Sequence, residues 1–291
     1  MNSTAALELV RLTPLMERTS GRAEVLIGLV DGPVAMNHPG VASHNIREIP
    51  GSMSGACSRA DSAACMHGTF VAGILAAKRG SPAPAICPDC TMLIRPIFSE
   101  ATPGNGKMPS ATSEELAKAV IEMIDAGARV LNLSAALVQP SSTSERRLEQ
   151  ALDHAASRHV IVVAAAGNQG TVGSSAITRH PWVLPVVACD LRGRPTAESN
   201  LSHSVGKRGL AAPGEDIISL APEGKLQTFS GTSAATPFVT GAIALLWSEF
   251  PGATAADVKF AVTRARVPHR NTVVPPVLDV SGAYQIILSG R

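Results

Sequence analysis

Short apolar segments that alternate with helical patterns limit the fold of this chain more than any other feature of its sequence. Segment 160–166 (VIVVAAA), for example, is apolar at every position, whereas a half-exposed strand alternates apolar and polar residues. Strands of this kind are buried on both faces, as in a parallel sheet covered by helices. We therefore expect strands at 24–30, 90–98, 129–134, 160–166 and 182–188. We expect helices at 4–18 (interrupted by Pro14), 66–77, 113–126, 143–158, from Ser233 onward, and at 254–264.

This alternation predicts the α/β class, with a three-layer, doubly wound parallel sheet and helices on both faces. The chain has 291 residues and a hydrophobic content of 45%, which is enough to bury a large core. No internal repeat or linker divides it. We expect a single domain over residues 1–291, with an N-terminal helical segment at 1–21 and the core of the fold at 22–266.

Charge and hydropathy argue against several classes of function. The formal net charge is +2, and the lysines and arginines are dispersed, so no basic surface for nucleic acid or an anionic membrane is predicted. No apolar run reaches membrane-spanning length, and the N-terminus lacks the pattern of a signal peptide. We expect a soluble, cytoplasmic protein.

The five cysteines leave more than one interpretation open. Cys57 and Cys65 form one local pair, and Cys87 and Cys90 form another, in the run CPDC. Two local disulfides, a four-cysteine zinc site and free thiols all fit this spacing, because zinc requires four converging thiolates but the spacing does not require zinc. All four are disulfide candidates. Cys189 follows an apolar run, and we expect it to be a small buried side chain.

Three polar residues lie where predicted strands end or helices begin. Asp31 follows the strand at 24–30, and in open α/β sheets active sites lie at such strand ends; its alternative is a turn aspartate. His67 opens a predicted helix, where a structural histidine is the alternative. Ser233 lies at the mouth of another helix, where it either caps the helix or acts as a nucleophile.

In a doubly wound sheet these three residues would meet at one edge. Acyl transfer by a serine needs a nucleophile, a base that takes its proton and an acid that orients the base. It also needs N–H donors for the oxyanion. Asn168, in a glycine-flanked turn after 160–166, is a candidate donor. Its alternative is a turn residue that tolerates left-handed φ.

The motifs around these residues resemble those of the subtilisin-like serine peptidases (peptidase S8). They are VDG at 30–32, HGTFVAG at 67–73, AAGN at 165–168 and GTSAATP at 231–237. The resemblance implies a subtilisin-like fold in which Ser233 is the nucleophile, His67 the general base and acid, and Asp31 its orienting acid. It implies that Asn168 is the oxyanion donor.

The resemblance also implies where a peptide substrate binds. The substrate is expected to add a β-strand along 133–137. The substrate-binding candidates are Leu133, Ser134, Ala135, Ala136, Ala165, Ala166 and Gly167. The family usually carries glycine soon after the serine of this segment, so Ala135 and Ala136 imply narrower pockets and a narrower range of substrates.

Other departures from the family are more specific. Only about 20 residues precede the first strand, so no long propeptide is expected, and the calcium loop expected after the His67 helix is absent. Segments 29–34, 85–90 and 130–137 are similar to the cyanobactin maturation proteases of the patellamide A and G types. The A type cleaves a leader from a ribosomal precursor peptide. The G type cleaves the follower and cyclises, and it carries a helical insertion between acid and histidine.

Only 35 residues separate Asp31 from His67, which leaves little room for such an insertion. We therefore expect a serine endopeptidase that removes the leader from a precursor peptide by hydrolysis. A precursor-peptide macrocyclase is the alternative within the class, and a catalytically silent peptide-binding module is the alternative outside it. A precursor peptide is the expected partner. We assign no cofactor or metal, and the oligomeric state is left open.

Overall fold

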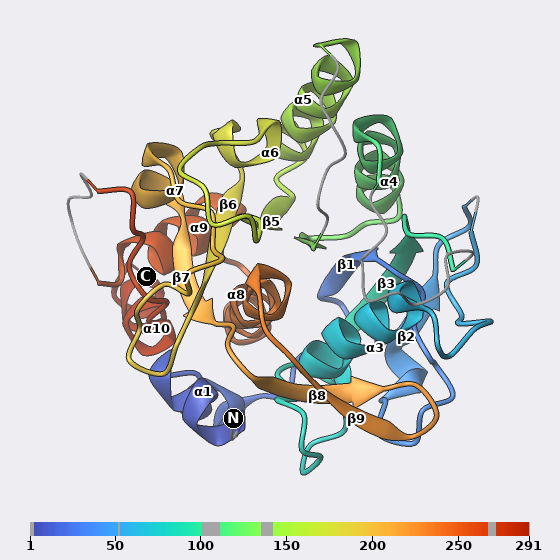
Figure 1. The fold of residues 1–291 in the computed structure, drawn as a ribbon. Helices are drawn as coiled ribbons and strands as arrows, with labels where there is room; N and C mark the ends of the chain where they lie inside the picture. Colours follow the sequence, from blue (N-terminus) through green and yellow to red (C-terminus); the bar gives the residue numbers. More distant parts are fainter. Residues whose placement is uncertain (1–2, 52, 101–110, 135–141, 267–271, 291) are drawn as a thin grey trace.

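A seven-stranded parallel sheet forms the centre of the protein (Figure 1). The computed structural model describes residues 3–51, 53–100, 111–134, 142–266 and 272–290. The strand order is β2-β3-β1-β4-β5-β6-β7, and an antiparallel hairpin, β8-β9, lies apart from the sheet. The strands are β1 (Leu26–Asp31), β2 (Ile46–Glu48), β3 (Thr91–Pro96), β4 (Val130–Leu133), β5 (Ile161–Ala165), β6 (Leu184–Cys189), β7 (Leu210–Pro213), β8 (Ile217–Ala221) and β9 (Lys225–Phe229).

Helices cover both faces of this sheet, as the sequence predicts. Helices α4 (Ser113–Asp125) and α5 (Ser142–Ser157) lie on one face, and α3 (Ala63–Ala76) and α8 (Thr232–Glu249) lie on the other (Figure 1). The remaining helices are α1 (Ser3–Leu9), α2 (Thr13–Arg18), η1 (Ser43–Asn45), α6 (Ala176–Arg179), α7 (His203–Arg208), α9 (Ala255–Arg264) and α10 (Val280–Ser289). No helix within the described ranges combines the length and hydropathy that a membrane span requires.

Strand β5 shows why its sequence is apolar throughout. Ile161 and Val163 point into the core beneath α3 and α8, whereas Val162 and Ala164 point into the core beneath α4 and α5. Successive side chains of a strand alternate between the faces of the sheet, so a strand covered on both faces needs apolar residues at every position. The three-layer architecture follows from this pattern.

Strand β1 lies in the middle of the sheet, between β3 and β4. Strands β2 and β3, which follow β1 in the sequence, lie on one side of it. Strands β4 to β7 lie on the other side. In such sheets the crevice for ligands lies at the carboxyl ends of the strands. Asp31 is the last residue of β1, so the topology places it at this edge.

The helices differ from the sequence prediction in several places: the predicted helix at 4–18 is divided into α1 and α2, the short helices α6 and α7 were not predicted, and α3 and α10 also differ. Helix α3 begins at Ala63 rather than near His67, because the side chain of Ser62 caps it by accepting from the backbone N–H of Cys65. Helix α10 is not among the predicted helices. Its segment contains Gly282, which disfavours helix, but Asp279 caps its first turn and the helix packs on α9 and α2.

The start of α3 packs backbone to backbone against the loop that follows Asp31. A Cβ atom on Gly68 would lie 2.4 Å from the carbonyl oxygens of Gly32 and Pro33. A Cβ atom on Gly32 would lie 2.0 Å from the carbonyl oxygen of Ala64. No side chain fits at either position. The two glycines therefore allow the approach that brings α3 next to the end of β1.

Replacing Gly68 by alanine should destabilise the protein, because the added methyl group meets backbone oxygens that cannot rotate away. We expect a loss of about 3 kcal/mol in the free energy of unfolding, measured by chemical denaturation. Gly173→Ala is the matched control, since its Cβ would have nothing within 4 Å. Equal stability of the two variants would contradict the close packing.

Candidate active site

Asp31 and His67 form a buried hydrogen-bonded pair. The Nδ1 atom of His67 lies 2.7 Å from Oδ1 of Asp31, and the two residues are 4% and 0% exposed. The backbone N–H of Gly32 donates to the same carboxylate oxygen at 2.6 Å. An imidazole whose Nδ1 is held by a carboxylate presents its other nitrogen, Nε2, to a reacting group.

The aromatic ring of Phe229 packs against the ring of His67. Its ring meets the ring of His67 edge to face, with centroids 5.5 Å apart, and also contacts Phe70. Phe229 ends β9, four residues before Ser233, and is not among the residues predicted for the site. The available signal was its rarity, because aromatic residues make up only 3% of this chain.

Ser233 lies in the first turn of α8. Gly231 precedes the helix as its N-cap with φ 137°, a conformation that favours glycine. Ser233 is 7% exposed, and its backbone N–H has no acceptor in the part of the chain that the structure describes. The first N–H groups of a helix lack partners within the helix. Ser233 thus combines a hydroxyl with a free N–H at the positive end of the helix dipole.

Asn168 is fixed beside this turn by its side-chain oxygen. Oδ1 accepts from the backbone N–H of Thr232 at 2.8 Å and from the Thr232 hydroxyl at 3.0 Å. This arrangement leaves the Nδ2 amide group of Asn168 without a partner within the described residues. The site therefore contains an oriented amide donor next to Ser233.

The structure thus brings the four predicted catalytic residues to neighbouring elements at one edge of the sheet. Asp31 ends β1, His67 lies in α3, Asn168 follows β5 and Ser233 begins α8. Within the described residues, no hydrogen bond links the Ser233 hydroxyl to His67. Hydrogen bonds of this kind often tighten only when substrate is bound.

The predicted substrate-binding residues fall into two groups. Leu133 pairs with both Val30 and Ala164 inside the sheet and is 1% exposed, so any pairing with a peptide must begin after it. Ser134 is buried, and its hydroxyl accepts from the side-chain amide of Asn132. Ala135 and Ala136 lie outside the described residues.

The second group, at 165–167, begins with the last residue of β5. Ala165 is half-buried, and Gly167 adopts a φ of 105°. The carbonyl oxygens of Ala166 and Gly167 accept from the side chain and the backbone of Asn200. The turn that carries Asn168 is therefore fixed from outside by Asn200.

The cysteines differ from the two-disulfide interpretation at one of the two pairs. Cys57 and Cys65 form a disulfide, whereas Cys87 and Cys90 are free thiols. The prediction of a disulfide at Cys87 and Cys90 is wrong, since both are free thiols; they lie among the side chains of the apolar core, where Cys90 is next to Ser248 of α8. The four-cysteine zinc site is also wrong, since two of its ligands are oxidised.

The pKa values of the Cys87 and Cys90 thiols shift in opposite directions. A hydrogen bond to Cys90, followed by burial, raises the pKa of Cys87 well above its usual range. The same hydrogen bond lowers the pKa of Cys90, although burial opposes it. Burial raises the pKa of Cys189, which is fully buried as predicted, to about 12. These thiols behave as core side chains.

Metal-ligating side chains converge at one place within the described ranges, where Cys57, Cys65 and Glu100 meet. The disulfide removes both sulfur atoms as thiolate ligands, and one carboxylate remains. A cavity of about 560 Å³ lies at the amino ends of β4 and β5, lined by Arg129, Val160 and Trp247 among others. It is at the opposite edge of the sheet from Asp31 and is separate from the site.

Comparison with protein families identifies one match that spans most of the chain. The sequence model of the subtilase family (peptidase S8) matches residues 22–276. Mycosin-3 of Mycobacterium tuberculosis is 31% identical over 248 aligned residues, which cover 66% of this chain and 52% of mycosin-3. The thermophilic serine proteinase of a Bacillus species is 35% identical over 185 residues, covering 63% of this chain and 43% of that protein. The chain spans about half the length of these curated relatives.

Solved structures agree with the more specific resemblance. The protease domain of PatA superposes with a TM-score of 0.83 at 32% identity, over 93% of this chain and 98% of that one. The prenylagaramide maturation protease PagA gives 0.80 at 29% identity, over 94% and 98%. The PatG macrocyclase domain gives 0.80 at 20% identity, over 96% and 95%, which shows a shared fold. The comparisons confirm the resemblance to the cyanobactin maturation proteases.

Thiol counting tests the cysteine assignment. Unfolded protein kept under non-reducing conditions should react with three equivalents of a thiol reagent, from Cys87, Cys90 and Cys189. After reduction all five cysteines should react. Peptide mapping by mass should place the two additional labels on Cys57 and Cys65, and labels elsewhere would contradict the pairing.

Proposed function

The chain belongs to the subtilase family, and we propose that it is a serine endopeptidase that hydrolyses an extended peptide, removing the leader from a ribosomal natural-product precursor. One observation carries the catalytic part of this proposal. The buried hydrogen bond between Asp31 and His67 lies on the same edge of the sheet as the α8 turn with Ser233. The likeness to PatA and PagA supports the choice of substrate.

His67 acts as base and then as acid. Its Nδ1–H donates to Asp31, so Nε2 is free to take the proton of the Ser233 hydroxyl as that oxygen attacks the scissile carbonyl. The resulting imidazolium is stabilised by the buried Asp31 carboxylate. It then gives the proton to the departing amine, and a water molecule later resolves the acyl-enzyme by the same route.

The negative charge on the tetrahedral intermediate is met by two donors. One is the Nδ2 amide of Asn168, and the other is the backbone N–H of Ser233. Both are oriented before the reaction, because Thr232 holds Asn168 and the helix holds Ser233. Donors fixed in advance need no reorganisation as charge develops, which is why they lower the barrier effectively.

The peptide is proposed to lie between the segment that begins at Ser134 and the segment at 165–167. Both follow the carboxyl ends of neighbouring strands, β4 and β5. An extended peptide placed there would bind by backbone hydrogen bonds, as an added strand does, and pockets for alternate side chains would set specificity. The sequence carries alanine at 135 and 136, where the family usually has glycine, and we expect this difference to restrict the range of peptides.

Hydrolysis is favoured over cyclisation by the segment between Asp31 and His67. In its described residues this segment holds only η1 and β2 before α3 begins. A cyclising enzyme must keep water from the acyl-enzyme until the substrate amine attacks, which requires cover over the site. This segment supplies no helical insertion for that purpose.

Labelling with a fluorophosphonate tests the catalytic assignment. The wild-type protein should be labelled at Ser233, whereas Ser233→Ala should not, and Ser289→Ala should label as the wild type does. An unlabelled wild-type protein would support a silent binding module and overturn the proposal. Label that survives Ser233→Ala would overturn the site.

Substitution of Asn168 tests the oxyanion donor. Asn168→Ala should lower kcat by about 10²–10³-fold with little change in KM. Asn168→Asp is the sharper variant, because it keeps the oxygen that holds Thr232 while it replaces the amide donor with a carboxylate. A kcat near the wild-type value in Asn168→Asp would contradict the role.

The product mass distinguishes hydrolysis from cyclisation. Precursor-like peptides with a leader and a core should yield the free leader and a linear core. A core product lighter than the linear acid by one water would show cyclisation instead. A labelled enzyme that cleaves no precursor-like peptide would contradict the substrate class but not the catalytic residues.

A further inference from the structure

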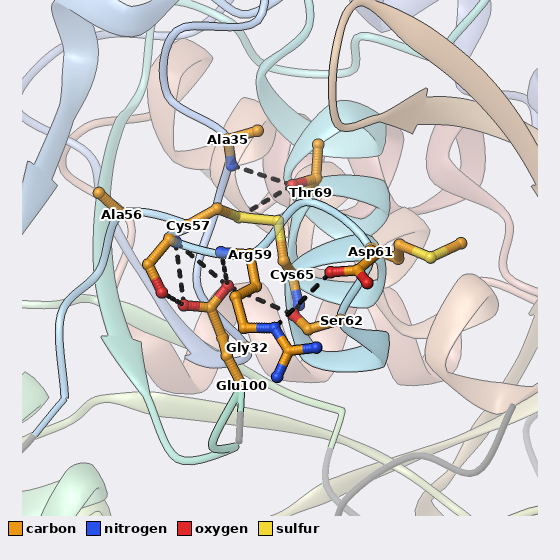
Figure 2. Close-up of a disulfide and its surroundings, with 12 residues drawn as sticks. Gly32, Ala35, Ala56, Cys57, Arg59, Asp61, Ser62, Cys65, Thr69 and Glu100 are labelled. Atoms are coloured by element: carbon orange, nitrogen blue, oxygen red, sulfur yellow. Dashed lines mark hydrogen bonds and ion pairs between the residues drawn. A yellow bond between two sulfur atoms is a disulfide. The ribbon is translucent and has the colours of Figure 1, made fainter. Parts of the chain in front are cut away.

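Residues 56–61 lead into α3 and contribute no buried side chain to the hydrophobic core. None of them is buried, whereas almost every residue of α3 from Ala64 onward is. A surface segment of this kind is normally the least ordered part of its surroundings. Here two other interactions fix it, a carboxylate and a disulfide (Figure 2).

The carboxylate belongs to Glu100, which follows β3. It accepts from the backbone N–H groups of Ser58 and Arg59, both at 3.0 Å, and from the hydroxyls of Ser58 and Ser62. All of these donors are neutral, since the guanidinium of Arg59 lies near Asp61 instead. One carboxylate therefore binds both the turn at 58–59 and Ser62, the N-cap residue of α3.

Burial by itself would raise the pKa of Glu100. The hydrogen bonds from Ser58, Arg59 and Ser62 outweigh it and lower the pKa. Glu100 is therefore ionised at neutral pH, and hydrogen bonds to an ionised acceptor are stronger than neutral ones.

The disulfide joins the same segment to α3. Cys57 lies at its start, and Cys65 lies in the first turn of the helix. The Thr69 hydroxyl, one turn further on, accepts from the backbone N–H of Ala35 at 2.9 Å and lies 3.8 Å from the Cys57 sulfur. Figure 2 shows these contacts on one side of α3. The first turns of α3 are thus tied both to segment 56–61 and to the loop after Asp31.

His67 lies two residues after Cys65, in the part of α3 that these contacts fix. A small rotation or shift of these turns would lengthen the 2.7 Å contact between His67 and Asp31. We propose that Glu100 is a positioning residue for His67 and acts together with the Cys57–Cys65 disulfide. This inference rests on the proposed function. Reduction of that disulfide lowers turnover rather than substrate binding.

The rate of Ser233 labelling by a fluorophosphonate is the primary test, because it depends on His67 but needs no peptide. Glu100→Gln removes the charge and places an amide N–H group near the backbone N–H groups of Ser58 and Arg59. The labelling rate of this variant should therefore fall roughly ten- to a hundred-fold. Glu100→Asp keeps the charge and should fall less. Glu149→Gln, an exposed carboxamide substitution on α5, should label at the wild-type rate.

The disulfide is tested by reduction. Dithiothreitol passes two electrons and two protons to the disulfide, giving two thiols and its own cyclic disulfide. The labelling rate of the wild-type protein should fall by a similar factor. The double variant Cys57→Ser with Cys65→Ser should label slowly in both conditions, with no further response to the reductant.

Kinetics on a cleaved peptide separate positioning from loss of folding. The kcat of Glu100→Gln should fall while KM stays within about two-fold, and its circular dichroism at the assay temperature should match the wild type. If Glu100→Gln and the reduced wild type label at the unreduced wild-type rate, or if only KM changes, the proposal is overturned. Failure of the wild type itself to label would instead contradict the proposed function.

Discussion

The close backbone contact between α3 and the loop after β1 is the interaction on which the site depends. Gly68 and Gly32 leave no side chain between the two segments, and the carbonyl oxygens of one lie where a Cβ of the other would be. This contact brings His67 within 2.7 Å of Asp31, a residue held at the end of a central strand. Because the pair is almost fully buried, a change of a few tenths of an ångström in the packing acts directly on a charged hydrogen bond.

The same logic applies to the start of α8. This helix is buried along nearly its whole length and packs on β4, β5, β6 and β7, so its position is set by the sheet. Its first turn then contacts the β5 turn through Asn168 and Thr232. Ser233 and Asn168 are thus placed by one helix against one strand, while His67 is placed by another helix against the end of β1. The site is accurate because each group derives its position from the sheet.

Sequence reasoning recovered what depends on local pattern. The apolar runs of β1 and β5 predicted a sheet covered on both faces, and the polar residues at strand ends and helix starts were expected at one edge of the sheet, where they lie. It failed where the outcome depends on contacts distant in sequence. The start of α3 is set by the Ser62 cap, and the interior position of Leu133 is set by pairing with β1 and β5. The contact of Phe229 with His67 joins a hairpin to a helix, and no local spacing indicates it.

The two cysteine pairs show why spacing alone could not distinguish a disulfide from free thiols. Cys87 and Cys90 lie in a turn whose side chains enter the apolar core, so burial already orders that turn. Cys57 lies in a segment without buried residues, where burial contributes little order. A covalent bond there removes conformational freedom that packing cannot remove, and Glu100 restricts the rest of the segment through hydrogen bonds. The oxidised pair is therefore the one with a cysteine in a segment that burial does not order, and its second cysteine lies two residues before His67.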